Sequence, residues 1–205
     1  MKIAVIGGTG MVGSRIVVEA AARGHQVTSV SRKGDALQSG NIAALKADVA
    51  DRAAMQELAA ENDVVVSAVG PSREPGGDPS TFAATLVDLA TAVSNARLLV
   101  VGGAGSLFAA PGVRLVDIPE FPDAYKAEAL AGAASFEALK ALPDAGEWSY
   151  LSPPPVITPG ERTGHYVVAD DVPAGETIST EDYAVALVDE IEQSAHSGRR
   201  FTVAN

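Results

Sequence analysis

The sequence of 205 residues contains no cysteine. This absence excludes disulfide bonds, cysteine nucleophiles and thiolate metal sites, and it is typical of the reducing cytoplasm, where we expect the protein to act. The histidines are only three, His25, His165 and His196, and their wide separation predicts no metal site. The sequence also lacks a G-x-S-x-G motif, which disfavours acyl hydrolysis.

Basic residues are scarce, with 15 Lys and Arg against 26 Asp and Glu, a net charge of −11. A nucleic-acid-binding protein needs a basic surface, so we expect no nucleic-acid partner. No apolar run approaches the roughly 18 residues that cross a membrane, and Gly7 interrupts the apolar start of the chain, so no membrane span or signal peptide is predicted. The sequence leaves the oligomeric state open.

Short β-branched runs alternate with alanine-rich segments of helical periodicity along most of the chain. Continuous apolar runs are typical of strands covered on both faces, so we predict an α/β fold of the Rossmann type: a doubly wound, mostly parallel sheet with helices on both faces. We expect one domain over residues 1–205, with substrate-side loops mainly within 102–179. The predicted strands are Lys2–Ile6, Gln26–Val30, Ala44–Ala47, Val64–Ala68, Leu98–Val101, Trp148–Ser152 and Arg200–Val203. The predicted helices are Met11–Arg23, Arg52–Ala60, Thr81–Ser94 and Ala127–Leu142. Ser179 and Asp182 resemble a capping box, which predicts a fifth helix that ends near Gln193. Pro111–Tyr125 is expected to be a loop.

A glycine-rich turn, GGTGMVG at residues 7–13, lies between the first predicted strand and the first helix. Glycines let the backbone approach a pyrophosphate, and the helix directs its N-terminal amides and positive dipole end at the anion. In this strand–turn–helix context the pattern predicts dinucleotide binding. Gly7, Thr9, Gly10 and Gly13 are expected to hold the pyrophosphate, and Met11 and Val12 are also expected to bind the cofactor.

The end of the second strand indicates which nicotinamide cofactor is preferred. An NAD site usually has Asp or Glu here, but the sequence reads Ser31-Arg32-Lys33. Because Arg and Lys bind a 2′-phosphate, NADP(H) is favoured. NAD(H) stays open, since Asp35 follows closely and the two cations could simply be solvated.

Two later strand ends complete the expected groove. Asp48 and Val49 follow the third strand and are candidates to bracket the adenine, although Asp48 could instead cap the helix at Arg52. Ala68, Val69 and Gly70 end the fourth strand, where small residues allow a ribose to lie against the backbone.

These motifs carry a family resemblance. GGTGMVG, ADVAD, VVSAVGP and VVGGAG, with the later segments FPDAYKAEALAGA, WSYLSPP and PGERTGHY, resemble the atypical short-chain dehydrogenase/reductases. The closest likeness is to the NmrA-like NAD(P)H-binding group, which includes NADH–flavin reductases and biliverdin reductase B. The resemblance implies a Rossmann fold, nicotinamide binding and, in some members, flavin reduction. The group also includes regulators that only sense the dinucleotide.

One feature of the wider superfamily is missing. Its tyrosine-dependent members use Tyr-x-x-x-Lys, whereas the residues four positions after the tyrosines of this chain are Ala129, Pro154, Asp170 and Leu187. Carbonyl reduction needs a positioned proton donor, but a flavin or quinone acceptor takes its proton from solvent. The sequence therefore favours a flavin-like or quinone-like acceptor.

The loops after the later strands supply the expected substrate side. Gly103 allows a flat ligand close to the backbone, and by resemblance Ser106 lies near the nicotinamide while Pro153 lines its far side. We take Ser106 and Tyr125 as the catalytic candidates. Ser106 could alternatively be a solvated serine in a flexible turn, and Phe108, Phe121 and Tyr125 form either an aromatic shelf or loop anchors.

The remaining polar residues lie in one loop and on the expected surface of the protein. The loop PSREPGGDPS at residues 71–80 suits a lid in which Arg73 clamps phosphate or is solvated. His25 is expected at the surface, His165 is open to substrate contact, and the acids Asp170, Asp171, Asp189, Glu190 and Glu192 are expected to be solvated.

The leading prediction is thus a cytoplasmic NAD(P)H-dependent oxidoreductase that passes hydride to a flavin-like or quinone-like acceptor. The alternative is a non-catalytic NAD(P)-sensing regulator. A nucleotide-sugar epimerase or dehydratase is less favoured, because the Tyr/Lys pair and a sugar-binding domain are missing.

Overall fold

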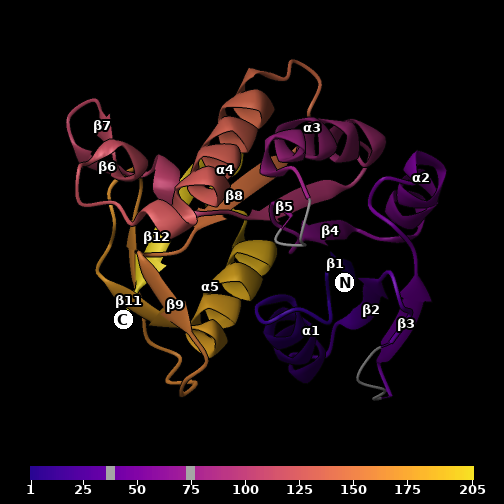
Figure 1. Ribbon diagram of the computed structural model, residues 1–205. Helices are drawn as coiled ribbons and strands as arrows, with labels where there is room; N and C mark the ends of the chain where they lie inside the picture. Colours follow the sequence, from indigo (N-terminus) through magenta and orange to yellow (C-terminus); the bar gives the residue numbers. More distant parts are fainter. Residues whose placement is uncertain (36–39, 73–76) are drawn as a thin grey trace.

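The computed structural model describes residues 1–35, 40–72 and 77–205, and within these ranges eight strands form one twisted sheet (Figure 1). The strand order is β10-β12-β8-β5-β4-β1-β2-β3. Every neighbouring pair is parallel except β10 and β12, which are antiparallel. The strands are β1 (Lys2–Ile6), β2 (Gln26–Ser31), β3 (Ile42–Lys46), β4 (Val64–Ser67), β5 (Arg97–Val101), β8 (Trp148–Ser152), β10 (Val167–Ala169) and β12 (Arg199–Ala204).

Helices cover both faces of this sheet, as Figure 1 shows. They are α1 (Gly13–Ala22), α2 (Arg52–Glu61), α3 (Phe82–Ala92), α4 (Asp123–Ala141) and α5 (Thr180–Gln193). Helices α1 and α5 pack together on one face, and α2, α3 and α4 follow one another across the other. The predicted doubly wound α/β fold is confirmed.

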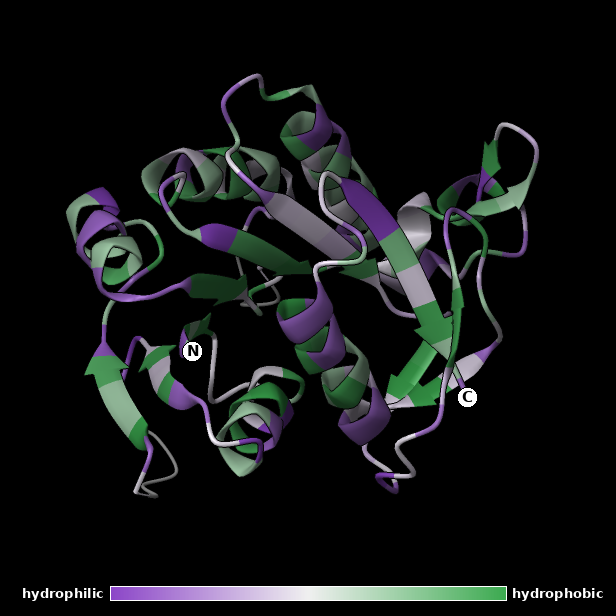
Figure 2. Ribbon diagram, turned by 180° about the vertical axis from the view of Figure 1, so that it is seen from behind, coloured by the Kyte–Doolittle hydropathy of each residue, from purple (hydrophilic) through white to green (hydrophobic). Residues whose placement is uncertain are grey.

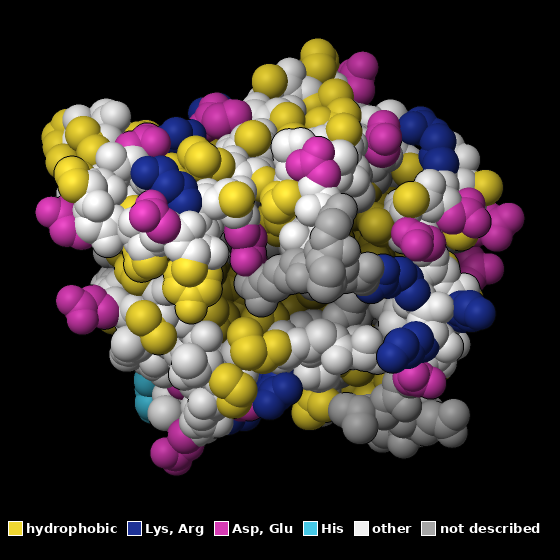
Figure 3. Space-filling view, viewed as in Figure 1, with side chains coloured by type: hydrophobic (Ala, Val, Ile, Leu, Met, Phe, Trp, Pro, Cys, Tyr) yellow, Lys and Arg dark blue, Asp and Glu magenta, His cyan; other side chains and the backbone are white. Residues whose placement is uncertain are grey.

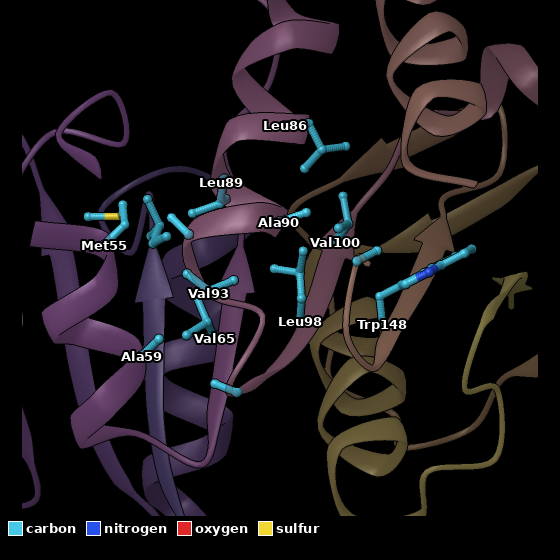
Figure 4. Packing of buried hydrophobic residues seen from close by; sticks show 14 of the residues in the cluster. Met55, Ala59, Val65, Leu86, Leu89, Ala90, Val93, Leu98, Val100 and Trp148 are labelled. Carbon is cyan, nitrogen blue, oxygen red and sulfur yellow. The ribbon is translucent and has the colours of Figure 1, made fainter. Parts of the chain in front are cut away.

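The alternation of side chains along β1 shows why both faces must be covered. Ile3 and Val5 belong to the apolar cluster under α1 and α5, whereas Ala4 and Ile6 belong to the cluster under α2, α3 and α4. All four side chains are buried. In Figure 4, Met55 and Leu89 from the helices meet Val65 and Leu98 from the sheet. The inner strands are mostly hydrophobic and the helices carry hydrophilic residues as well (Figure 2), as expected for a sheet between two helix layers.

The region from residue 108 to residue 125 differs from the predicted loop. Strands β6 (Phe108–Ala110) and β7 (Val113–Arg114) form a hairpin, a short 3₁₀ turn η3 (Leu115–Asp117) follows, and α4 already begins at Asp123. Pro122 precedes the first turn of α4, so proline marks the helix boundary here rather than a longer loop. Strands this short have too few residues to show a periodic pattern.

The remaining short elements complete the chain. Strands β9 (Val156–Thr158) and β11 (Thr177–Ser179) pair in parallel, and 3₁₀ turns occur at η1 (Pro79–Thr81) and η2 (Ala104–Ser106). Ser179 caps α5 by accepting a hydrogen bond from the backbone N–H of Asp182 at 2.9 Å, as the sequence predicts.

Two expectations about charged residues are wrong. Glu190 is buried, not solvated, and binds the buried Arg97 at 2.5 Å and the ring of His196 at 2.7 Å. His25 is also buried, and its Nε2 lies 2.9 Å from a carboxylate oxygen of Glu192. Asp189 is likewise paired, with Arg23 at 2.6 Å. Apart from His196, which is six positions from Glu190, these partners lie far apart in the chain, so no local pattern reveals them.

None of the described helices is long and apolar enough to cross a membrane. Residues 1–35, 40–72 and 77–205 also contain no group of three or more His, Asp or Glu side chains that could hold a metal ion.

Candidate dinucleotide-binding site

The glycine-rich turn lies where β1 ends and α1 begins, between the neighbouring strands β2 and β4. Gly7 has a φ of +80°, and a Cβ there would lie 2.7 Å from the carbonyl oxygen of Ala68. A Cβ on Gly13 would overlap the carbonyl oxygen of Gly7. The backbones of the strand, the turn and the helix therefore approach more closely than any residue with a side chain permits.

The N-terminus of α1 is left open to an anion. Val12 at the N-cap position supplies no side-chain cap, and the first turn contains no acidic residue. No described residue accepts a hydrogen bond from the backbone N–H of Thr9, Met11, Val12 or Gly13. Bare glycine backbone and unpaired amides at a helix N-terminus meet the steric and electrostatic needs of a diphosphate. A dinucleotide thus fits the residues present.

A cationic corner flanks this turn, over the carboxyl ends of β2 and β3. Ser31 shapes it by accepting a hydrogen bond from the backbone N–H of Gly34 at 3.0 Å. Its members are exposed basic side chains at the strand ends and at the start of α2: Arg32, Lys33, Lys46 and Arg52. Figure 3 shows several Lys and Arg side chains at the right of this face. Lys46 stands opposite Ser31 in the sheet register. Sequence reasoning missed Lys46, because only the pairing of β2 with β3 places it opposite Ser31, and it also missed Arg52 at the start of α2.

The structure tests the capping role considered for Asp48. The N-cap of α2 is Asp51, whose carboxylate accepts from the N–H of Ala54 at 3.1 Å, so the capping role suggested for Asp48 is wrong. Asp48 is exposed and accepts from the N–H of Ala50 at 3.0 Å. Val49 beside it is partly buried against the apolar cluster.

The end of β4 closes against the glycine turn. The backbone N–H of Ala68 donates to Ile6 at 2.8 Å, and the Ala68 methyl group lies 3.2 Å from where a Cβ on Gly13 would stand. Val69 is half-buried beside Gly7, while Gly70 is exposed with open space around it. The residues predicted for the pyrophosphate and the ribose therefore do lie together.

The substrate-side loop after β5 rests on a buried aromatic ring. A Cβ on Gly102 would overlap the ring of Tyr150, whereas Gly103 has open space around it. Burial raises the pKa of the Tyr150 phenol, which Ser135 and the Gly103 backbone only partly offset, so this tyrosine stays neutral. Pro153 is buried directly after β8.

Ser106 is not solvated, and it lies in the 3₁₀ turn η2. It is only 5 % exposed, and Arg200 donates to its Oγ at 2.9 Å and to its carbonyl oxygen at 2.8 Å. Tyr125, by contrast, is 63 % exposed on the first turn of α4. The structure does not join the two catalytic candidates by a hydrogen bond within the described residues.

Phe108 and Phe121 are both half-buried. The central carbon of the Arg200 guanidinium lies over the Phe108 ring, 5.8 Å from the centroid of that ring. This contact agrees with the role of Phe108 as a loop anchor. His165 is exposed, its backbone N–H donates to the Thr163 hydroxyl at 3.1 Å, and its carbonyl oxygen lies 3.3 Å from the same hydroxyl. Arg73 and Glu74, considered for a lid, lie outside the described residues.

Cavity volume alone does not locate this site. A cavity of about 490 Å³ lies beside Met1, Gln26 and Asp63, at the amino-terminal ends of β1, β2 and β4. Open parallel sheets bind ligands at the opposite, carboxyl edge of the strands. The chemistry of the glycine turn, rather than this hollow, identifies the candidate site.

The sheet order, the glycine turn and the open helix N-terminus together define a Rossmann-type dinucleotide-binding protein. The NAD(P)H-binding family model matches residues 7–194, and the chain belongs to this family. This confirms the resemblance to the NmrA-like group of atypical short-chain dehydrogenase/reductases and shows that the cofactor is a nicotinamide dinucleotide.

Known relatives extend over the whole chain. YwnB of Bacillus subtilis, a protein without an assigned function, is 38% identical over 219 residues, covering 100% of this chain and 99% of YwnB. A Streptococcus pneumoniae protein provisionally named an NADH-flavin reductase has a solved structure with a TM-score of 0.89 and 32% identity, covering 100% of this chain and 99% of that one.

A second solved structure, from Burkholderia pseudomallei, has a TM-score of 0.86 and 44% identity, with full coverage of both chains. That protein is provisionally described as exported, so the cytoplasmic location of the present chain stays a prediction. A Bacteroides thetaiotaomicron protein, provisionally an epimerase, has a TM-score of 0.87 and 34% identity, covering 99% of this chain and 96% of that one.

Proposed function

We propose that the protein is an NAD(P)H-dependent oxidoreductase that transfers hydride to a flavin-like or quinone-like acceptor, with NADP(H) as the preferred cofactor. The observation that carries the proposal is the open N-terminus of α1 over the glycine turn, which suits a dinucleotide. The family match and the name of the Streptococcus pneumoniae relative support the redox chemistry.

Each part of the dinucleotide has a proposed set of contacts within residues 1–205, which we take as one binding unit. The glycine turn and the first amides of α1 hold the diphosphate, the cationic corner holds the 2′-phosphate, and Asp48 and Val49 flank the adenine. Ala68, Val69 and Gly70 lie along a ribose, and Gly103 and Pro153 border the nicotinamide. The substrate-side loops, mainly within residues 102–179, surround the acceptor.

Bound NAD(P)H supplies the hydride. The task of the protein is then to orient the acceptor and exclude water, since correct placement alone accelerates a transfer between two bound molecules. Ser106 donates a hydrogen bond to the acceptor, and the exposed ring of Tyr125 covers it from the open side. No lysine follows any tyrosine at the fourth position, so the proton comes from solvent.

The test of turnover is direct. Purified protein is mixed with NADPH and either FMN or a naphthoquinone, and the loss of reduced-nicotinamide absorbance is followed. We expect oxidation that depends on both protein and acceptor. Tight NADPH binding without oxidation would contradict the proposal and favour a dinucleotide-sensing regulator.

The cofactor preference has its own test in the double variant R32A/K33A. Each charge-assisted contact to a phosphate contributes about 1.5–3 kcal/mol, so NADPH affinity should fall at least about tenfold while NADH affinity stays level. The matched control K140A/R199A removes two exposed cations far from the glycine turn and should change neither affinity. If NADPH affinity is unchanged in R32A/K33A, the assignment of the 2′-phosphate is wrong.

A further inference from the structure

The hydroxyl group of Ser106 is buried, and it accepts a hydrogen bond but donates none within the described residues. Arg200 donates one N–H of Nη1 to Oγ and another to the carbonyl oxygen of the same residue. A guanidinium group can only donate, so a lone pair of Oγ accepts from Arg200 and the hydroxyl proton must point elsewhere. No described residue accepts a hydrogen bond from that proton. A buried donor without an acceptor is costly, so the Ser106 hydroxyl is left available to an acceptor from outside the chain.

Arg200 is itself held firmly on a rigid element. It lies in β12 opposite Tyr150 of β8, so it reaches the loop after β5 from within the sheet rather than from solvent. Its guanidinium stacks 4.5 Å from the centre of the Phe136 ring, and Asp171 accepts from its Nη2 at 2.5 Å and from its Nε at 3.1 Å. The side chain of Arg200 is 2 % exposed. A donor fixed from several sides leaves Ser106 little freedom to rotate its hydroxyl group.

This arrangement leaves the Ser106 hydroxyl able to act only as a hydrogen-bond donor toward a ligand. A free serine hydroxyl can donate or accept, whereas one that already accepts from a cation is polarised toward donating. We propose that Arg200 is a positioning residue that fixes Ser106 as a hydrogen-bond donor, so that the site selects acceptors that present a carbonyl oxygen or an unprotonated ring nitrogen. The inference rests on the proposed function and names the feature of the acceptor that the site reads.

The expected contribution to rate follows from where charge develops. The acceptor gains the hydride with its electron pair, its carbonyl oxygen or ring nitrogen becomes more basic, and it then takes a proton from solvent while Ser106 keeps its own. A donor aimed at that atom binds more strongly as the negative charge builds, which lowers the barrier. The donor helps only when Arg200 holds it in this orientation.

The experiment compares the wild type with S106A, R200M and the double variant S106A/R200M, using NADPH with FMN and with 2-methyl-1,4-naphthoquinone. Each single variant should lower kcat/KM about tenfold, the effect of one hydrogen bond. Because Arg200 acts through Ser106, the double variant should be no slower than either single variant. Losses that multiply, or a loss in S106A but none in R200M, would overturn the inference.

Two further variants separate positioning from folding. R199M changes the neighbouring exposed arginine of β12 and should keep wild-type kinetics. R200K keeps a cationic donor in the buried position and should recover part of the activity lost in R200M. Should R200M fail to fold, R200K replaces it in the comparison of wild type, the two single variants and the double variant. If the losses of kcat/KM in R200K and S106A then multiply in the double variant, the coupling is refuted.

Binding of the acceptor distinguishes this inference from the proposed function. Quenching of FMN fluorescence in the presence of NADP⁺ measures affinity without turnover. If the wild type does not oxidise NADPH, the proposed function fails, but equal and non-additive losses of FMN affinity in S106A and R200M would still support the coupling. Equal binding to all four proteins, or binding to none, would overturn it.

Discussion

Replacing Gly13 with alanine tests the geometry on which the dinucleotide site depends. The added methyl group would overlap the carbonyl oxygen of Gly7 and lie 2.9 Å from its carbonyl carbon and 3.2 Å from the Ala68 methyl. Two of these three atoms belong to the backbone, which cannot rotate away. Overpacking of this kind costs about 1–3 kcal/mol, and the better helix propensity of alanine returns at most about 1 kcal/mol. We therefore expect the free energy of unfolding to fall by about 1–2 kcal/mol, as urea denaturation measures.

Gly132 provides the matched control. It also lies inside a helix, α4, but no atom stands within 4 Å of where its Cβ would be. The same substitution should therefore stabilise the protein by about 0.5–1 kcal/mol. G13A should in addition weaken NADPH binding, while G132A should not. A G13A variant as stable as the wild type would refute the close approach of Gly7 and Gly13.

Three further predictions concern stability. E190Q leaves the buried cation of Arg97 without its 2.5 Å partner, so the free energy of unfolding at neutral pH should fall by about 3–5 kcal/mol; a loss under about 1 kcal/mol in urea would contradict this. Burial alone would raise the pKa of Glu190, but the hydrogen bonds from His196 and Ser149 and the charge of His196 together outweigh it and lower the pKa. The stabilisation that the ionised Glu190 carboxylate provides is thus complete at a pH above its ordinary pKa of 4.5 and declines as the pH falls below that value. The difference in the free energy of unfolding between wild type and E190Q should therefore shrink at low pH. S179A removes the cap of α5 and should cost about 1 kcal/mol in the same assay, with S179D restoring part of it.

The dinucleotide end of the site could be predicted because its requirements are local. The strand, the glycine turn and α1 occupy consecutive residues, and the spacing of Gly7, Gly10 and Gly13 reflects contacts within that short segment. Ser31 ends β2 and Arg32 and Lys33 follow it directly, so their place at the carboxyl edge follows from the prediction of this strand. Which role each residue plays toward a ligand stays a prediction.

The substrate end could not be predicted in the same way. Arg200 meets Ser106 across 94 positions of the sequence, and Arg97 meets Glu190 across 93. Charged residues that are buried as ion pairs show no periodic pattern in the sequence. The sequence therefore predicts Glu190 to be solvated and Arg200 to be only the first residue of a strand. The start of α4 lies four residues before the predicted one, because Pro122 marks the helix boundary rather than the interior of a loop.

Sequence alone determined the parallel sheet, the helices on its two faces and the bare backbone of the glycine turn, since periodicity and glycine spacing act over neighbouring residues. Only the tertiary structure decided that Lys46 joins the cationic corner, that Asp51 rather than Asp48 caps α2, and that Arg200 takes one side of the Ser106 hydroxyl. Each of these depends on strand pairing or on the path of a long side chain through the core, and both arise only when distant segments pack together.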